Sequence, residues 1–303
     1  MMQGLAIDYQ DGQSYFADLV APIVKGEVSR RFVKFSRRDA GRLLDLKVDS
    51  KGQPKEASID VSSDTYVEQG YGEIQKIANV DISDAVNIPD LFAHHQRALM
   101  YDLKRARENR VLTLAMAASS YASGCTSALS STNRWDVTQA TSTANPVNDI
   151  RITAGTAPGM ARRFNTMLIG LPAWEYLRTH PKVIAAAGGS ASDRVVGMEE
   201  MKVVFGLQNI FVSDVKYDTA GAAAAASYAF MAPKSCALIW TQPGASRNEL
   251  SFMKTFRQHD LEFVDEMQQT PGVRGITILK GSHADAEKVV ANDAGYLLDT
   301  VIS

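Results

Sequence analysis

The feature that most constrains this chain is a long stretch without helix breakers. The segment Asn87-Ile88-Pro89-Asp90 offers a helix cap, a first-turn proline and an early acid, and neither proline nor glycine follows until beyond Tyr121. A helix of ~30 residues and ~45 Å is therefore predicted. Its middle, residues 102–110, is strongly charged, with Lys104 and Glu108 at the supportive i,i+4 spacing, whereas residues 111–118 are small and apolar. Such a change of character is typical of a spine that passes different neighbours.

Residues 1–27 are predicted to form an N-terminal arm with at most one short helix. Apolar side chains cluster between Tyr15 and Val24 at helical spacing, but Pro22 would interrupt a long helix. An arm this apolar requires a cover, either from its own domain or from a neighbouring subunit.

A projecting β-hairpin is predicted over residues 28–80. One strand begins at Val28, a second covers residues 66–74, and turn-forming residues fill positions 49–55 between them. The segment has too few large apolar side chains to form a core of its own.

The charges of this hairpin are segregated. Residues 29–56 carry nine basic and four acidic side chains, a net of +5, whereas residues 57–90 carry seven acidic and one basic, a net of −6. Two interpretations stay open. The two arms neutralise each other within one hairpin, or the loop lies on an adjacent subunit, where opposite charges set the register.

The rest of the chain divides into three parts. The fold class predicted for the whole chain is α+β. Residues 81–146 hold the spine helix and a surface loop, 119–146, anchored by Trp135; residues 147–247 form a compact α/β unit; residues 248–303 are strand-like. In the α/β unit we expect helices at 147–156, 172–181 and 197–205 and strands at 166–170, 209–215 and 236–241. Further strands are expected at 252–257, 261–266, 273–279 and 295–301.

Composition indicates an ordinary folded protein. The 303 residues are 45% hydrophobic and 22% charged with a net charge of −2, so a dedicated nucleic-acid reader or membrane-surface binder is disfavoured. Cys125 and Cys236 are far apart, which argues against a disulfide scaffold or a zinc module. No apolar run reaches the ~18–20 residues that cross a bilayer, and the first residues lack a signal-peptide pattern, so we expect a protein without membrane contact.

No motif in the sequence indicates catalytic chemistry. The chain has no phosphate-binding loop, no GxGxxG and no GxSxG, so we expect neither cofactor, metal nor enzymatic activity. Acidic pairs at 199–200 and 265–266 are expected to be solvated. Surface or interface positions are expected for the histidines, which are His94, His95, His180, His259 and His283.

The basic run from Lys104 to Arg110 is interpreted as a solvated or intersubunit face rather than a DNA site, because acids accompany it and no aromatic platform does. Charged side chains of the hairpin and the spine are candidates for intersubunit contacts. They are Arg30, Arg31, Arg37, Arg38, Lys51, Lys55, Asp60, Asp64, Glu68, Glu73, Lys104, Arg105 and Arg107.

The order of several motifs resembles one known family. These motifs are Tyr-Val-Glu-Gln-Gly-Tyr-Gly from Tyr66, Ile-Pro-Asp-Leu from Ile88, Asn-Pro-Val-Asn-Asp-Ile from Asn145, Asn-Thr-Met-Leu-Ile-Gly-Leu-Pro-Ala-Trp from Asn165, Phe-Gly-Leu from Phe205, Asn-Ile-Phe-Val-Ser from Asn209 and Ala-Gly-Tyr-Leu-Leu from Ala294. Together they are similar to major capsid proteins of tailed bacteriophages with the HK97-like fold, over about residues 15–303.

The resemblance implies an architecture and partners. Residues 1–27 would be the N-arm, 28–80 the E-loop, 81–146 and 248–303 the peripheral domain, and 147–247 the axial domain. It implies hexamers and pentamers closed around local symmetry axes, within a virion assembled in the bacterial cytoplasm. A portal, decoration proteins and double-stranded DNA, contacted weakly and without sequence specificity, are further implied partners.

Two departures from the family pattern matter. No long helical segment precedes the arm to act as a built-in scaffold, so a separate scaffolding protein is expected. Crosslinking between a loop-tip lysine (Lys47, Lys51 or Lys55) and Asn292 is imaginable but disfavoured, because surface lysines at loop tips are common.

Two alternatives stay open. An encapsulin-type nanocompartment shares the fold, and cargo inside small DNA-free shells would favour it. An α/β enzyme is the alternative of another class, for which the sequence offers no identifiable active site.

Overall fold

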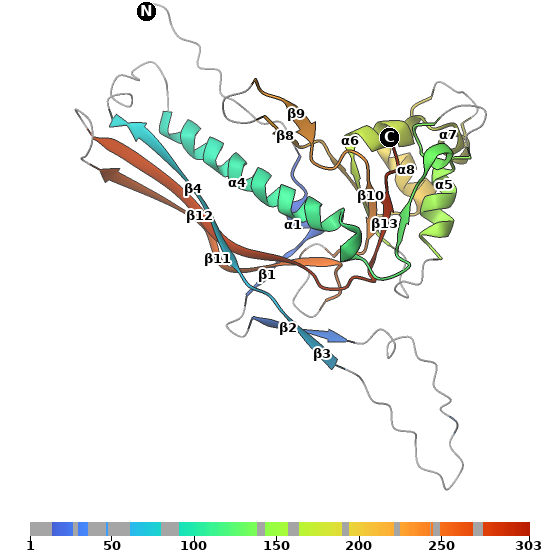
Figure 1. Ribbon diagram of the computed structural model, residues 1–303, viewed down its shortest axis with the longest axis horizontal. Helices are drawn as coiled ribbons and strands as arrows, with labels where there is room; N and C mark the ends of the chain where they lie inside the picture. Colours follow the sequence, from blue (N-terminus) through green and yellow to red (C-terminus); the bar gives the residue numbers. More distant parts are fainter. Residues whose placement is uncertain are drawn as a thin grey trace, which may run out of the picture.

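The computed structural model describes residues 14–26, 30–35, 47, 61–79, 91–137, 143–156, 164–189, 194–220, 225–242, 244, 249–268 and 275–303. Two larger sheets organise these residues, one with a long helix lying along it and the other flanked by short helices (Figure 1).

A four-stranded sheet joins strands from distant parts of the chain. Its order is β1-β11-β12-β4, made by Ile23–Lys25, Met253–Gln268, Ile276–Val289 and Gln69–Ala78. β1 runs parallel to β11, and the other pairs are antiparallel. The strands predicted at 252–257 and 261–266 are one strand, because two register shifts between Arg257 and Glu262 absorb the break in alternation. The strand predicted at 273–279 continues to Val289.

The predicted spine helix is α4, Leu91–Ala115, which lies along this sheet (Figure 1). Its buried stripe repeats every four residues, at Leu99, Leu103, Arg107, Val111 and Ala115. The helix ends before the predicted Tyr121, because the Tyr121 hydroxyl donates to the Ala115 carbonyl at 2.5 Å and a 3₁₀ turn, Ala118–Ser120, follows. The predicted cap at 87–90 lies outside the described residues.

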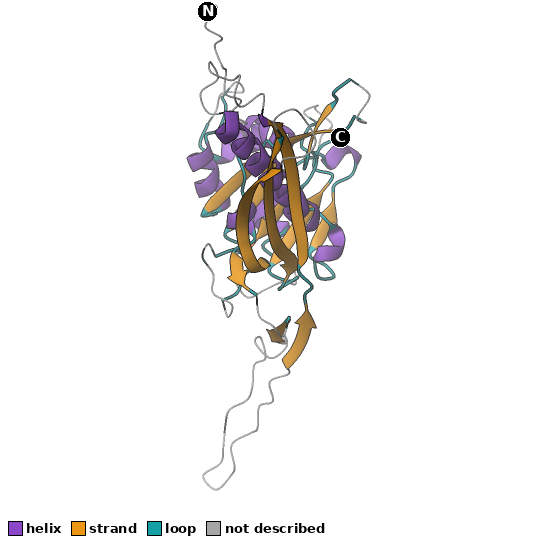
Figure 2. Ribbon diagram, turned by 90° about the vertical axis from the view of Figure 1, so that its left-hand side faces the viewer, coloured by secondary structure: helices purple, strands orange, loops and turns teal. Residues whose placement is uncertain are grey.

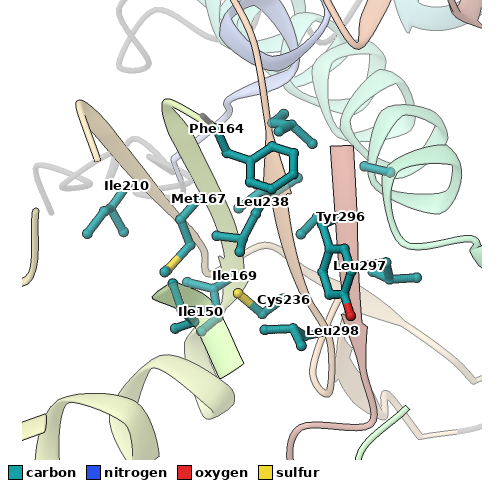
Figure 3. Packing of buried hydrophobic residues seen from close by; sticks show 14 of the residues in the cluster. Ile150, Phe164, Met167, Ile169, Ile210, Cys236, Leu238, Tyr296, Leu297 and Leu298 are labelled. Carbon is teal, nitrogen blue, oxygen red and sulfur yellow. The ribbon is translucent and has the colours of Figure 1, made fainter. Parts of the chain in front are cut away.

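The second sheet has five strands and forms the centre of the main core. Its order is β5-β13-β10-β6-β7, made by Thr126–Ala128, Gly295–Asp299, Cys236–Ile239, Thr166–Gly170 and Asn209–Ser213. All five residues of β6 are buried, as the apolar run predicted. Figure 3 shows Met167, Ile169 and Leu238 of this core among their neighbours.

Short helices flank this sheet close to where the sequence predicts them. The first, α5 (Pro146–Asn148), passes into a π-helical turn (Asp149–Thr153), and α6 (Leu171–Thr179), α7 (Pro181–Ala186) and α8 (Met198–Phe205) follow. Pro181 does not only close α6 but also opens α7, as proline favours the first turn of a helix.

Three further small units lie in the described part of the chain. The arm holds α1, Ala17–Val20, as its apolar cluster predicted. A hairpin base pairs β2 (Arg31–Phe35) with β3 (Val61–Thr65), and a second hairpin pairs β8 (Lys216–Asp218) with β9 (Tyr228–Phe230). Figure 2 shows β2 and β3 standing apart from the body of the molecule.

One predicted pairing is wrong. The strand expected at 66–74 does not return along the hairpin, because β3 does so at residues 61–65. Instead, residues 69–78 form β4 and pair with β12 in the main sheet. The alternation of β4, with Ile77 buried and Ile74 exposed, suits a sheet with one covered face as well as it suits a hairpin arm.

Candidate assembly surfaces and an internal charge network

The hairpin base is held by a small aromatic core. The Phe256 ring of β11 stacks on Tyr66 at 4.1 Å and on Phe32 at 5.5 Å between ring centroids, and all three side chains are buried. Arg30 takes a positive φ of 49°, and its carbonyl accepts from the Tyr66 N–H at 3.0 Å. The hairpin therefore leaves the body from a fixed root.

The structure places the charged hairpin candidates unevenly. Arg30 and Arg31 are exposed beside this root, and Asp64 and Glu68 are half-buried. The Glu68 side chain packs against Gly26. A Cβ added to Gly26 would lie 2.2 Å from Oε1 of Glu68. The remaining hairpin candidates lie outside the described residues; they are Arg37, Arg38, Lys51, Lys55 and Asp60.

The spine candidates also separate. Lys104 is exposed, and Arg105 pairs with Asp102 at 3.1 Å on the same helix. Glu73 of β4 is half-buried, and its pKa is raised by burial and by Asp102. The Lys104–Glu108 pair predicted from spacing is wrong as a surface pair, because Glu108 is buried.

Arg107, a candidate intersubunit residue, is buried within the subunit. It occupies the buried stripe of α4, where it pairs with Asp18 of the arm and lies 3.7 Å from Asp285 of β12. Its Nη2 also donates to the Thr255 hydroxyl of β11 at 3.3 Å. A long guanidinium at a stripe position can be buried in this way where carboxylates meet it.

Asp285 is the centre of this internal charge network. Its carboxylate is fully buried and accepts two hydrogen bonds from Arg257, at 2.7 and 2.9 Å. Arg110 lies 4.0 Å away, binds Glu287 at 2.8 Å and stacks on Tyr71 at 3.6 Å. Although burial opposes ionisation, the hydrogen bond and charge of Arg257 keep the pKa of Asp285 below its usual range. The network ties the arm, α4 and three strands of the sheet together.

Two histidines are buried, contrary to the expectation of surface positions. His283 lies 3.3 Å from Asp285, and burial together with three neighbouring guanidiniums lowers its pKa. His180 caps α7 by accepting from the Lys182 N–H at 3.2 Å, and burial lowers its pKa to about 4. His94 and His95 are half-buried on α4, and the side chain of His259 lies outside the described residues.

Sequence reasoning missed the network, although a signal was present. Residues 277, 279, 281, 283 and 285 share one face of β12 by alternation. Because Leu279 is a core residue, His283 and Asp285 on the same face had to be buried as well.

Among the described residues, the opposite face of the four-stranded sheet is exposed on β4 and β12, whereas the aromatic core of the hairpin root covers it near Phe256; the exposed part is called the open sheet face. On it Ile74 is 55% exposed, Lys76 and Lys280 are exposed, and Ile278 is half-buried. The register sets Ile74 against Lys280 and Lys76 against Ile278, so apolar and cationic side chains alternate across the strands. Figure 2 shows these long strands without a helix over them on the side facing the viewer.

The described residues hold no cluster of His, Cys, Asp or Glu suited to a metal ion. Within the same part of the chain, none of the helices has both the length and the hydrophobicity to span a bilayer.

The hairpin, the spine helix on a long-stranded sheet and the α/β unit define the HK97-like fold of phage capsid proteins. A phage-related protein from Bordetella bronchiseptica RB50 is similar with a TM-score of 0.69 at 17% identity, over 97% of this chain and 94% of that one. The capsid of cyanophage P-SCSP1u is similar with a TM-score of 0.60 at 12% identity, over 97% and 93%.

A curated relative agrees with the structural likeness. The major capsid protein of Pseudomonas phage JBD67 is 21% identical over 304 residues, which cover 100% of this chain and 96% of the relative. No protein-family profile matches the chain. The encapsulin alternative is not better supported by these comparisons.

Proposed function

We propose that the chain is the major capsid protein of a tailed phage, which assembles through copies of itself into the shell of the virion. The observation that carries the proposal is the HK97-like fold over almost the whole chain. A full-length relative named as a major capsid protein supports it. The role is structural, with no reaction assigned.

Within this proposal the domains follow the fold. Residues 1–27 are the N-arm, the hairpin rooted at β2 and β3 is the E-loop, and residues 147–247 are the axial domain. The peripheral domain comprises α4 and the long-stranded sheet, to which β4 now belongs. Hexamers and pentamers form the shell.

The open sheet face is the surface on which we place a neighbour's hairpin. Its alternating isoleucines and lysines offer apolar area and positive charge. Asp60 and Asp64, the acids on the returning side of the hairpin, would pair with these lysines and set the register more than they add affinity. The other acids of residues 57–90 follow β3 in the chain, so both interpretations of the segregated charges stay open.

Other partners follow from the same proposal. A separate scaffolding protein, a portal and decoration proteins act with the shell, which is assembled in the host bacterial cytoplasm. The near-neutral charge suits a wall that contacts packaged double-stranded DNA weakly, because each neutralised phosphate adds salt-dependent affinity.

The sheet-face interface is tested with a double substitution, Ile74→Asp with Lys76→Glu. Both side chains point away from α4, so the subunit should keep its circular dichroism spectrum and unfolding temperature while shell yield falls at least tenfold. Lys216→Glu, at an exposed lysine of β8 outside this face, is the control and should assemble normally. Wild-type shell yield from the double variant would contradict the interface.

A further inference from the structure

The arm docks on the spine helix through one buried carboxylate. Glu108 is 1% exposed, and its Oε2 accepts from the backbone N–H of Phe16 at 3.0 Å and of Ala17 at 2.7 Å. Both donors therefore meet one oxygen, and Oε1 takes neither of these bonds.

Other contacts hold the same segment without an acid. Thr255 donates its hydroxyl to the Ala21 carbonyl at 3.1 Å, and Thr241 donates to the Leu19 carbonyl at 2.9 Å. The Phe16 ring stacks on Phe211 at 5.0 Å between centroids. These contacts explain how the arm stays folded on the body, and their groups do not titrate near neutral pH.

The charged groups around Glu108 come from each neighbouring element. Arg107 precedes Glu108 on α4, and Asp18 of α1 is a second charged neighbour. Beyond Arg107 lies Asp285 of β12, and at the start of the described arm Asp214 accepts from the Ser14 N–H at 3.0 Å. Arg107 is shared between Asp18 and Asp285, so it does not form a dedicated pair with Glu108.

A carboxylate this buried with no dedicated cation is costly to ionise. Burial raises the pKa of Glu108 to about 7, although the two backbone donors and Arg107 oppose the rise. When the arm leaves, water reaches the carboxyl group and its pKa returns toward the ordinary value. The docked state therefore binds the proton more tightly, so docking is favoured at low pH and weakens as pH rises through 7.

We propose that Glu108 makes docking of the N-terminal arm, residues 14–25, a proton-coupled latch: the arm closes over a protonated carboxyl and loosens when Glu108 ionises. Oε1, which takes neither backbone bond, carries the proton while Oε2 keeps both backbone N–H bonds. The latch belongs to the folded subunit and does not depend on the proposed shell function.

Hydrogen exchange tests the latch on the full chain, kept below the concentration at which it assembles. Protection of the amides of residues 16–21, corrected for the intrinsic effect of pH on exchange, is measured at pH 6.0 and pH 8.5. Wild type should lose about tenfold in protection over this range, as expected for a group that shifts from about 4.5 to about 7 on docking.

Two variants separate the latch from general effects of pH. Glu108→Gln keeps an acceptor oxygen without the charge, so its protection should be independent of pH and equal to wild type at pH 6.0. Glu175→Gln, at an exposed carboxylate of α6, should keep the wild-type dependence. Flat wild-type protection would overturn the proposal whether or not the variants fold, and so would an unchanged slope in Glu108→Gln.

Discussion

At the scale of single residues, buried charge and close packing decide where this chain tolerates change. Asp285 is the clearest case, since one fully buried carboxylate faces Arg107, Arg110 and Arg257. Buried ion pairs add little net stability over an apolar core, but removing one partner leaves the others uncompensated.

Asp285→Asn should therefore destabilise the subunit by about 3–5 kcal/mol. The measurement is urea unfolding followed by circular dichroism at pH 7.5. Glu199→Gln is the control, because Glu199 forms only an exposed i,i+3 pair with Lys202 and should change stability by less than about 1 kcal/mol. Equal effects of the two substitutions would show that the network is not a stabilising unit.

Gly170 tests packing in the second sheet. A Cβ at this position would lie 1.6 Å from the Ala232 carbonyl oxygen, so Gly170→Ala must displace backbone and should cost about 3 kcal/mol or more. Gly197→Ala is the matched substitution, since no atom lies within 4 Å of its Cβ position and its φ is −74°. Thermal unfolding of both variants is the measurement, and a stable Gly170→Ala would be incompatible with the packing described.

Single residues were the least predictable from sequence. Arg107 and Glu108 looked like a solvated face because their letters are charged, and only the stripe positions of α4 and the arm show why both are buried. By contrast, Trp135 was predicted as an anchor, and its indole N–H donates to Asp149 at 3.0 Å in a fully buried position.

At the scale of elements, the local sequence pattern predicted that a helix or strand exists better than it predicted which strands pair. The absence of helix breakers predicted α4, and an apolar run predicted β6. The partner of β4 was mistaken, because its alternation is satisfied equally by a hairpin arm and by an edge of the main sheet. β1 was missed as a strand, since its three residues pair only through the distant β11.

The contact between α4 and β12 should weaken in acid. The pKa of His283 is lowered in the folded subunit, so the unfolded chain takes up the proton first, near pH 6.5, and stability is lost as pH falls from there. The loss should approach about 1.4 kcal/mol per pH unit until His283 is protonated in the folded state as well.

The measurement is the free energy of unfolding between pH 7 and pH 5. It is made in a Glu108→Gln background, because Glu108, with its raised pKa, contributes a slope of opposite sign. His283→Gln in that background should lower the slope without abolishing it, because His180, whose pKa is lowered to about 4, keeps a slope of the same sign. A profile that keeps its slope without His283 would assign the acid sensitivity to another group.

At the scale of the whole molecule, the order of parts was predictable and their mutual placement was not. Arm, hairpin, spine, α/β unit and returning strands follow one another as the sequence indicated. The joining of β1 and β4 into one sheet with β11 and β12 depends on contacts far apart in the chain, which local periodicity does not encode. The open sheet face emerges only from that joining.

The most direct test of the account is electron microscopy of the purified full-length protein across a concentration series, alone and with any scaffolding protein encoded beside its gene. We expect closed shells, or rings of five and six subunits, that appear as concentration rises. A uniform monomer or dimer under every condition, with scaffolding protein present, would contradict it.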